Sequence, residues 1–215
     1  MSCPGVKPLF VVVEGVDGVG KTSVVEAARK ALEAVGHDTH VVRDMWSTHL
    51  GDYVRQMFLG EDHPKAVKLA LAHAVRAVIA CEEVQPKLES NVTVVSDRWY
   101  YSSFAYNVDR DDIDGAILFS EMAASIDKLC RTPDLLIYVE PDSVDKSFAR
   151  AMASTPGKDV FMESGVELQR NAIAQYEHLL GFDLGPTEVL CVKSEPGDLP
   201  HFEKILDFVR LNYNG

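Results

Sequence analysis

The sequence predicts an α/β fold of three layers, α/β/α, in which helices cover both faces of a parallel sheet of about five strands. Short apolar runs rich in β-branched residues alternate with longer segments whose apolar residues recur every three or four positions. The first apolar run leads directly into a glycine-rich loop and then into a helical segment. The chain has 215 residues, of which 47% are hydrophobic, so it can bury this core as a single domain, residues 1–215.

The expected strands and helices alternate along the chain. Strands are predicted at residues 9–13, 39–42, 93–95, 135–139 and 189–192. Helices are predicted at residues 22–35, 50–59, 65–88, 113–129, 144–152, 166–180 and 202–211. Pro156 and Gly157 follow the helix at 144–152, and they suit a short lid, at roughly residues 151–163, that closes over a ligand and excludes water.

The composition limits the classes of partner. A formal net charge of −12 repels polyanions, so we expect no nucleic acid as a partner. The cysteines lie far apart without the spacing of metal ligands, which predicts free thiols in a reducing compartment. No signal-peptide pattern precedes the first strand, and no apolar run approaches the length of a membrane span. We therefore expect a soluble, cytoplasmic protein with small-molecule partners and no membrane contact.

The loop after the first strand carries the pattern G-x-x-x-x-G-K-[ST]. In a strand–loop–helix context this pattern forms a P-loop, whose glycines let backbone N–H groups converge on phosphate oxygens at a helix N-terminus. Lys21 would reach the transferred phosphoryl group, and the Thr22 hydroxyl would hold Mg²⁺. ATP and Mg²⁺ are therefore the expected cofactors. The predicted ATP-binding residues are Gly15, Gly18, Val19, Gly20, Lys21, Thr22 and Ser23.

A second candidate site follows the third strand, which ends in Asp97 and Arg98. Ligands of α/β folds bind at the carboxyl ends of the strands, where Asp97 would reach the metal through water. Arg98 offers a planar fork for a second phosphate. The competing interpretation is a structural surface turn.

These motifs together resemble the thymidylate kinase family, and most closely its bacterial motif set. The family's D-R-Y-x-x-S-x-x-A-Y-Q is matched by Asp97–Asn107, although Trp99 replaces Tyr and Asn107 replaces Gln. The segment Arg43–Arg55 aligns without a gap with the family's R-E-P-G-G-T-P-L-G-E-x-I-R. Arg76 stands at the family's spacing before the D-R pair.

The resemblance implies the reaction ATP + dNMP → ADP + dNDP in a homodimeric P-loop kinase that serves nucleotide biosynthesis. It implies that Arg98 and Arg43 hold the acceptor phosphate, that Asp17 accepts the 3′-hydroxyl, and that Tyr106 packs under the sugar. The implied substrate-binding residues are Asp17, Arg43, Trp46, Arg55, Ala72, Arg76, Arg98, Ser102, Tyr106 and Asn107. The implied catalytic residues are Lys21, Asp97, Arg98, Arg150 and Lys158, and the implied metal ligands are Thr22 and Asp97.

Departures from the family at several positions bear on the substrate and the rate. Ala72 stands where the family has a Phe that stacks on thymine, and Trp46 stands where it has a Gly. Ala72 opens space and Trp46 could fold over the base, so dUMP or a 5-substituted dUMP fits as readily as dTMP. The catalytic arginine of one family subtype is replaced by Gly18, and the lid offers only Arg150 and Lys158.

Several alternatives stay open at this point. A deoxynucleoside kinase, a P-loop kinase of modified DNA bases, or a nucleotide-binding regulatory protein with weak catalysis would share the P-loop. Arg76 and Arg55 could be solvated helix charges, and Tyr106 could be core packing, which we expect for Tyr100 and Tyr101.

Overall fold

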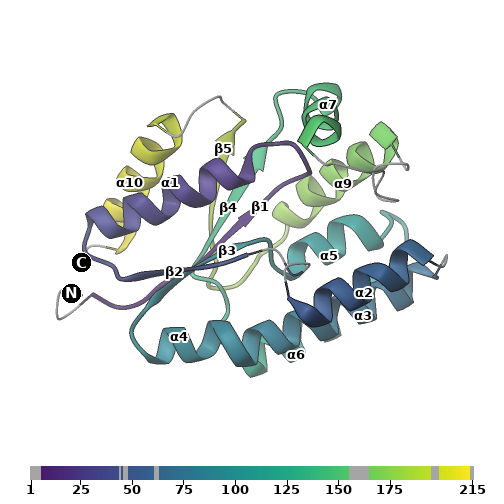
Figure 1. Cartoon of the computed structure of the whole chain (residues 1–215), viewed down its shortest axis with the longest axis horizontal. Helices are drawn as coiled ribbons and strands as arrows, with labels where there is room; N and C mark the ends of the chain where they lie inside the picture. Colours follow the sequence, from purple (N-terminus) through teal and green to yellow (C-terminus); the bar gives the residue numbers. More distant parts are fainter. Residues whose placement is uncertain are drawn as a thin grey trace.

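The computed structural model describes residues 6–43, 45, 48–60, 63–154, 165–194 and 199–213. Its centre is a five-stranded parallel sheet with the strand order β2-β3-β1-β4-β5 (Figure 1). The strands are β1 (Phe10–Glu14), β2 (Thr39–Val42), β3 (Thr93–Asp97), β4 (Leu135–Glu140) and β5 (Glu188–Lys193). The predicted parallel sheet and its strand positions are confirmed, because apolar runs of β-branched residues suit strands that are covered on both faces.

Helices cover the two faces of the sheet unequally. α1 (Lys21–Ala34) and α10 (Leu199–Tyr213) pack together over one face (Figure 1). The other face carries a larger group, namely α3 (Lys65–Ile79), α4 (Gln85–Glu89), α5 (Tyr100–Asn107), α6 (Ile113–Leu129) and α9 (Gly165–Leu180). α2 (His49–Gly60) packs on α3, and α7 (Val144–Ser154) packs on α9. The three-layer architecture is therefore as expected.

Two elements differ from the sequence prediction. The long helix expected at 65–88 is interrupted after α3 by a π-helical stretch, η2 (Ala80–Val84), before α4 begins. The helix α5 was not predicted. Most of its residues are buried, including Tyr100 and Tyr101 at 5% and 3% exposure, so it shows no polar face and little helical periodicity. The expectation that these two tyrosines pack in the core is confirmed.

The register of the sheet brings the ends of three strands together. Val13 lies opposite Asp97 of β3, and Glu14 lies opposite Tyr138 of β4. The loop that follows β1 therefore lies beside the end of β3, at the carboxyl edge where α/β folds bind ligands. Among the described residues, no helix combines the length and the apolar character needed to cross a bilayer.

Candidate functional site

The P-loop has a backbone that only glycine tolerates at two positions. Gly15 and Gly18 have φ angles of 147° and 72°. A Cβ atom on Gly15 would lie 2.9 Å from the carbonyl oxygen of Val139, and one on Gly18 would lie 1.9 Å from that of Ser147. The loop thus passes directly over the end of β4 and the backbone of α7, and it ends at Gly20, where α1 begins. Its amides can converge on an anion there.

Lys21 is the first residue of α1, and its side chain folds back over the loop. Its ammonium group donates a hydrogen bond to the carbonyl oxygen of Val16 at 3.0 Å and lies 3.7 Å from the Asp17 carboxylate. The residue is only 9% exposed, while the Thr22 side chain next to it is exposed. Lys21 and Thr22 therefore lie where the loop meets α1, and their expected roles in binding phosphate and Mg²⁺ stay predictions.

Arg98 is buried against the P-loop. Its backbone N–H donates to the Val13 carbonyl at 2.9 Å, and its φ of 70° is a left-handed conformation that a non-glycine residue rarely adopts. Its guanidinium donates to the Gly15 carbonyl at 3.0 Å and forms an ion pair with Asp17. With 6% exposure, Arg98 is no part of a surface turn, so that competing interpretation is wrong.

Asp17 lies between the two cations. Burial raises the pKa of this carboxyl group, but the charges and hydrogen bonds of Arg98 and Lys21 together lower it by more. The net pKa therefore lies below the ordinary value of 3.8. Asp17 is thus an ionised acceptor that links the loop to the end of β3. It can orient both cations or accept a hydroxyl group.

A buried carboxylate, Glu14, binds two hydroxyl groups, those of Ser102 and Tyr176, that also accept hydrogen bonds from Arg98. Glu14 is fully buried and accepts hydrogen bonds from the Trp99 N–H at 2.7 Å, the Ser102 hydroxyl at 2.5 Å and the Tyr176 hydroxyl at 2.8 Å. Arg98 in turn donates to the Ser102 hydroxyl at 3.0 Å. Because Glu14 caps the first turn of α5 and also binds α9, the network fixes three elements around Arg98.

Sequence reasoning missed Glu14 and Tyr176 as functional residues. Glu14 directly precedes Gly15, the first glycine of the P-loop, and this position was the available signal. Tyr176 gave no signal, since 162 residues separate it from Glu14 in the chain. Burial and the Glu14 charge raise the pKa of the Tyr176 hydroxyl well above 10, so it remains a hydrogen-bond donor.

The described residues expected around the base and the sugar are buried or half-buried, and none of them is exposed to solvent as a surface helix residue would be. The Arg76 side chain is fully buried, and its guanidinium carbon lies 5.8 Å from the ring centroid of Trp99. The interpretation of Arg76 as a solvated helix charge is therefore wrong. Tyr106 lies under Arg98, with 5.5 Å between its ring centroid and the guanidinium carbon. Ala72 is 5% exposed, so it leaves no open surface.

The remaining predicted residues are less closely joined to this centre. Arg43 is exposed just after β2, at the same edge of the sheet, and Arg55 is half-buried on α2. The Asn107 amide donates to the Ser103 carbonyl of its own helix at 3.0 Å. Trp46 and Lys158 lie outside the described residues, as does the expected lid beyond Ser154. Their assigned roles stay predictions.

Arg150 joins the helix α7 to the P-loop. Its Nε donates to the Gly18 carbonyl at 2.8 Å, and its Nη2 donates to Asp142 at 2.8 Å. Ser194, which follows β5, donates to the Val19 carbonyl at 2.8 Å. Arg150 and Ser194 therefore hold the loop backbone from the α7 side, and the catalytic role expected for Arg150 stays a prediction.

The donor set suits Mg²⁺ better than a transition metal. Thr22 and Asp97 offer oxygen atoms, the ligands that Mg²⁺ prefers. Thr22 lies in the first turn of α1, the helix after β1, and Asp97 is the last residue of β3. The strands β1 and β3 are neighbours in the sheet. Within the described part of the chain, no three His, Cys, Asp or Glu side chains converge on one point.

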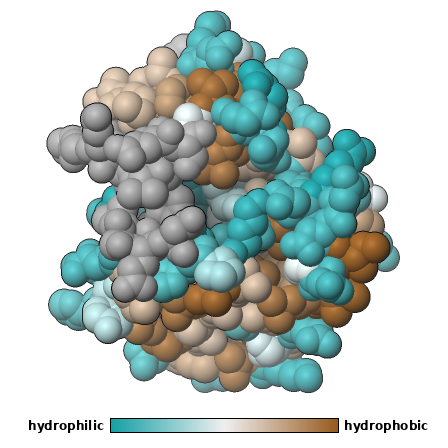
Figure 2. All heavy atoms as spheres, turned by 90° about the vertical axis from the view of Figure 1, so that its right-hand side faces the viewer, coloured by the Kyte–Doolittle hydropathy of each residue, from teal (hydrophilic) through white to brown (hydrophobic). Residues whose placement is uncertain are grey.

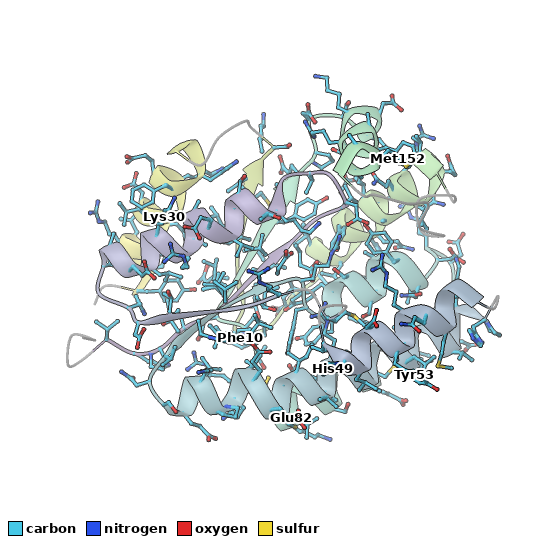
Figure 3. All side chains as sticks on the ribbon, in the orientation of Figure 1. Phe10, Lys30, His49, Tyr53, Glu82 and Met152 are labelled. Atoms are coloured by element: carbon cyan, nitrogen blue, oxygen red, sulfur yellow. The ribbon has the colours of Figure 1, made fainter. Side chains whose placement is uncertain are left out.

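The site lies between two groups of helices. In Figure 3, Met152 of α7 lies above the carboxyl edge of the sheet, and Tyr53 of α2 lies below it. Figure 2 looks onto this end of the molecule and shows a hollow with hydrophilic side chains along its right-hand border. A hollow between helices at the carboxyl edge is a common position for a ligand in this class of fold.

Comparisons with known proteins agree with this geometry. The sequence model of the family described as "Thymidylate kinase" matches residues 13–189. A thymidylate kinase of Baumannia cicadellinicola is 33% identical over 183 residues, which cover 82% of this chain and 84% of that protein. One of Halothermothrix orenii is 31% identical over 150 residues, covering 69% and 71%. One of Bifidobacterium longum (strain DJO10A) is 45% identical over 105 residues, covering 46% and 50%.

Proposed function

Because the chain belongs to the thymidylate kinase family, we propose that this nucleoside-monophosphate kinase transfers the γ-phosphoryl group of ATP to dTMP. The observation that carries the proposal is the Asp17–Arg98 ion pair beside Lys21. The Asp17 carboxylate contacts both Lys21 of the P-loop and Arg98 of the β3–α5 junction, so the two cations lie close together. Two polyanionic substrates need such cations on both sides to approach one another.

The residues divide between the two substrates. Lys21 and the amides of the P-loop hold the phosphates of ATP, and Thr22 with Asp97 would hold Mg²⁺, which supplies neutralising charge when bound. Arg98 holds the phosphate of dTMP. The attacking phosphate oxygen is already ionised, so the reaction needs positioning and charge neutralisation rather than a strong general base.

Ser102 acts in this proposal by positioning. It was expected among the substrate-binding residues, and its hydroxyl donates to Glu14 and accepts from Arg98. It therefore orients the guanidinium that binds the acceptor phosphate. Tyr106 lies under the same guanidinium and packs against the sugar in this proposal. Arg76, on α3, contacts the edge of the base.

The assembly and the compartment are also part of the proposal. α6, which packs on α3, exposes Ile113 and Ile117 to 72% and 54%, which supports a homodimer through this pair of helices. The described cysteines, Cys81, Cys130 and Cys191, are free thiols, as expected in the cytoplasm. Size-exclusion chromatography with light scattering measures the assembly, and a monomer at micromolar concentration would contradict the dimer.

The test is ADP formation with Mg²⁺ over a panel of acceptors: dTMP, dUMP, 5-hydroxymethyl-dUMP, dCMP, dGMP, UMP and thymidine. We expect dTMP to have the highest kcat/KM. A preference for a 5-substituted dUMP would instead assign specificity to Ala72 and Trp46. Turnover of thymidine alone, or of no acceptor, would overturn the proposal.

A matched pair of variants tests the role of Arg98 in the same assay. Arg98→Ala should raise the KM for dTMP far more than the KM for ATP, because the guanidinium serves the acceptor. Arg29→Ala removes an arginine of α1 whose partners are Glu26 and Glu33. It should leave both KM values unchanged. Equal increases of the two KM values in Arg98→Ala would contradict the assignment.

A further inference from the structure

A second cavity lies away from the P-loop, between the β4–β5 edge of the sheet and the helices α7 and α9. Its volume is about 570 Å³, within the range of sites for small organic ligands. None of the residues assigned above to ATP, Mg²⁺ or dTMP lines it. The lining residues that matter for its chemistry are Tyr138, Glu140, Val144, Ile173, Glu177 and Cys191.

The floor of the cavity carries a buried hydroxyl group. Tyr138 lies opposite Cys191 in the β4–β5 register, so both side chains point to the same face of the sheet. Tyr138 is 3% exposed, and its ring packs against Tyr176 with 5.3 Å between the centroids. Within the described residues its hydroxyl has no hydrogen-bond partner. A buried polar group of this kind is costly to leave unsatisfied, so a ligand atom at this point would be favourable.

The rim of the cavity is negatively charged. Glu140 and Glu177 both line it, and no Lys or Arg does so among the described residues. Burial raises the pKa of the Tyr138 hydroxyl, and the charges of Glu177 and Glu140 raise it further. Burial and Glu140 likewise raise the pKa of the Cys191 thiol, although Lys204 on α10 opposes this. Both groups are therefore uncharged, and the field in the cavity favours a cation.

Apolar side chains complete the walls. Val144 of α7 and Ile173 and Leu180 of α9 line the cavity beside the carboxylates. A ligand that suits this lining has an apolar body and one positive end. An ammonium group has three N–H donors, which matches two carboxylates and one tyrosine oxygen.

We propose that this cavity binds a small amphipathic amine, with its ammonium group between Glu140 and Glu177 and its apolar body against α7 and α9. Anionic nucleotides are excluded by the like charge of the two carboxylates. The site is separate from the phosphoryl-transfer centre.

The test uses 2-phenylethylamine as the probe, with 2-phenylethanol and 3-phenylpropanoate as neutral and anionic compounds of similar size. Titration of the full chain, followed by NMR, should show saturable binding of the amine only. The double variant Glu140→Gln/Glu177→Gln should weaken it by about tenfold or more, since charge-assisted hydrogen bonds are lost. Glu121→Gln on α6 removes an equal charge outside the lining and should not change it. Equal affinity for the amine and the alcohol would overturn the proposal.

Thiol labelling gives a second readout on the unsubstituted protein. The amine should slow the alkylation of Cys191, which lines the cavity, and should not slow that of the exposed Cys81. Unprotected Cys191 at a saturating amine concentration would contradict the assigned position. Adding ATP and dTMP together should not displace the amine, and displacement would show that the cavity belongs to the nucleotide site. Since this readout needs no turnover, it stands whether or not the proposed kinase activity is found.

Discussion

The donor and the acceptor sides of the proposed active site are built in different ways. The donor side is one continuous segment, Glu14–Ser23, whose path depends on glycines with positive φ and on the start of α1. The acceptor side depends on Arg98, which is oriented by Ser102 on the following helix and by two residues distant in the chain, Asp17 of the P-loop and Tyr176 of α9. The comparison teaches that a phosphate loop can be specified locally, whereas a buried guanidinium needs a network of remote partners.

The largest effect is expected from a substitution on the donor side. Lys21→Ala should lower kcat by about 10²–10³-fold, because it removes the cation that meets the charge developing on the transferred group. Steady-state ADP formation measures this effect. Lys30→Ala, on the same helix but paired with Glu26 at the surface, is the control and should retain full activity. Wild-type turnover in Lys21→Ala would contradict the donor assignment.

The next prediction separates backbone strain from close packing in the loop. Gly18→Ala should reduce the free energy of unfolding by about 2–4 kcal/mol, because the new Cβ atom clashes with the backbone of α7 as well as requiring a positive φ. Gly185→Ala has a similar φ of 66° and meets nothing within 4 Å. It should cost only about 1 kcal/mol in urea denaturation. Equal losses for the two variants would show that the contact with α7 contributes nothing.

A smaller effect is expected on the acceptor side from a conservative change. Arg98→Lys keeps the charge but loses the planar fork that reaches Gly15, Ser102 and Asp17 together. The KM for dTMP should rise by about 10–30-fold, with a smaller change in the KM for ATP. Initial-rate kinetics with each substrate varied in turn measure the two constants. An unchanged KM for dTMP would show that charge alone suffices.

The network behind Arg98 is tested by Tyr176→Phe, which removes one hydroxyl group. We expect a rise in the KM for dTMP of about three- to tenfold and a loss of stability of about 1–2 kcal/mol, because the Glu14 carboxylate loses a buried donor. Tyr213→Phe removes a hydroxyl that donates to the Asp134 carbonyl, away from the site. This control should lower stability without changing the KM for dTMP. A purely structural role for Tyr176 would give the same pattern as the control.

The smallest expected effect is on the pH dependence of stability, and it comes from His37, which belongs to neither side of the site. Burial lowers the pKa of His37 below 6.5, and its Nδ1 lies 2.7 Å from the Thr93 hydroxyl near the start of β3. The unfolded chain therefore binds this proton more readily than the folded one. The stabilisation is complete above pH 6.5 and is lost as the pH falls from 6.5 toward the folded pKa.

Urea denaturation as a function of pH measures this change. His37→Gln should show a shallower loss of stability below pH 6.5, while a part of the slope remains because burial also lowers the pKa of His73. Asp17 does not contribute in this range, since its pKa lies below 3.8. Identical slopes for the variant and the wild type would contradict the role of His37.

The sequence by itself determined the order of the strands and of most helices, the pattern of the P-loop and the position of the pair Asp97–Arg98 at the end of β3. These features are local, because hydrophobic periodicity, glycine conformation and motif spacing act over a few residues. The boundaries of β2 and α6 were predicted to the residue. The helix α5 escaped prediction because its burial on most sides, which depends on its neighbours, left no polar face to recognise.

Only the tertiary structure decided how the acceptor side is assembled. It buried Arg76 against Trp99, brought Tyr176 to Glu14, and placed Tyr138 and Cys191 on the floor of a second cavity. A contact between residues far apart in the chain depends on how every intervening element packs. No local pattern contains that information. The phosphate loop could therefore be predicted from the sequence, whereas the contact of Tyr176 with Glu14 behind Arg98 could not.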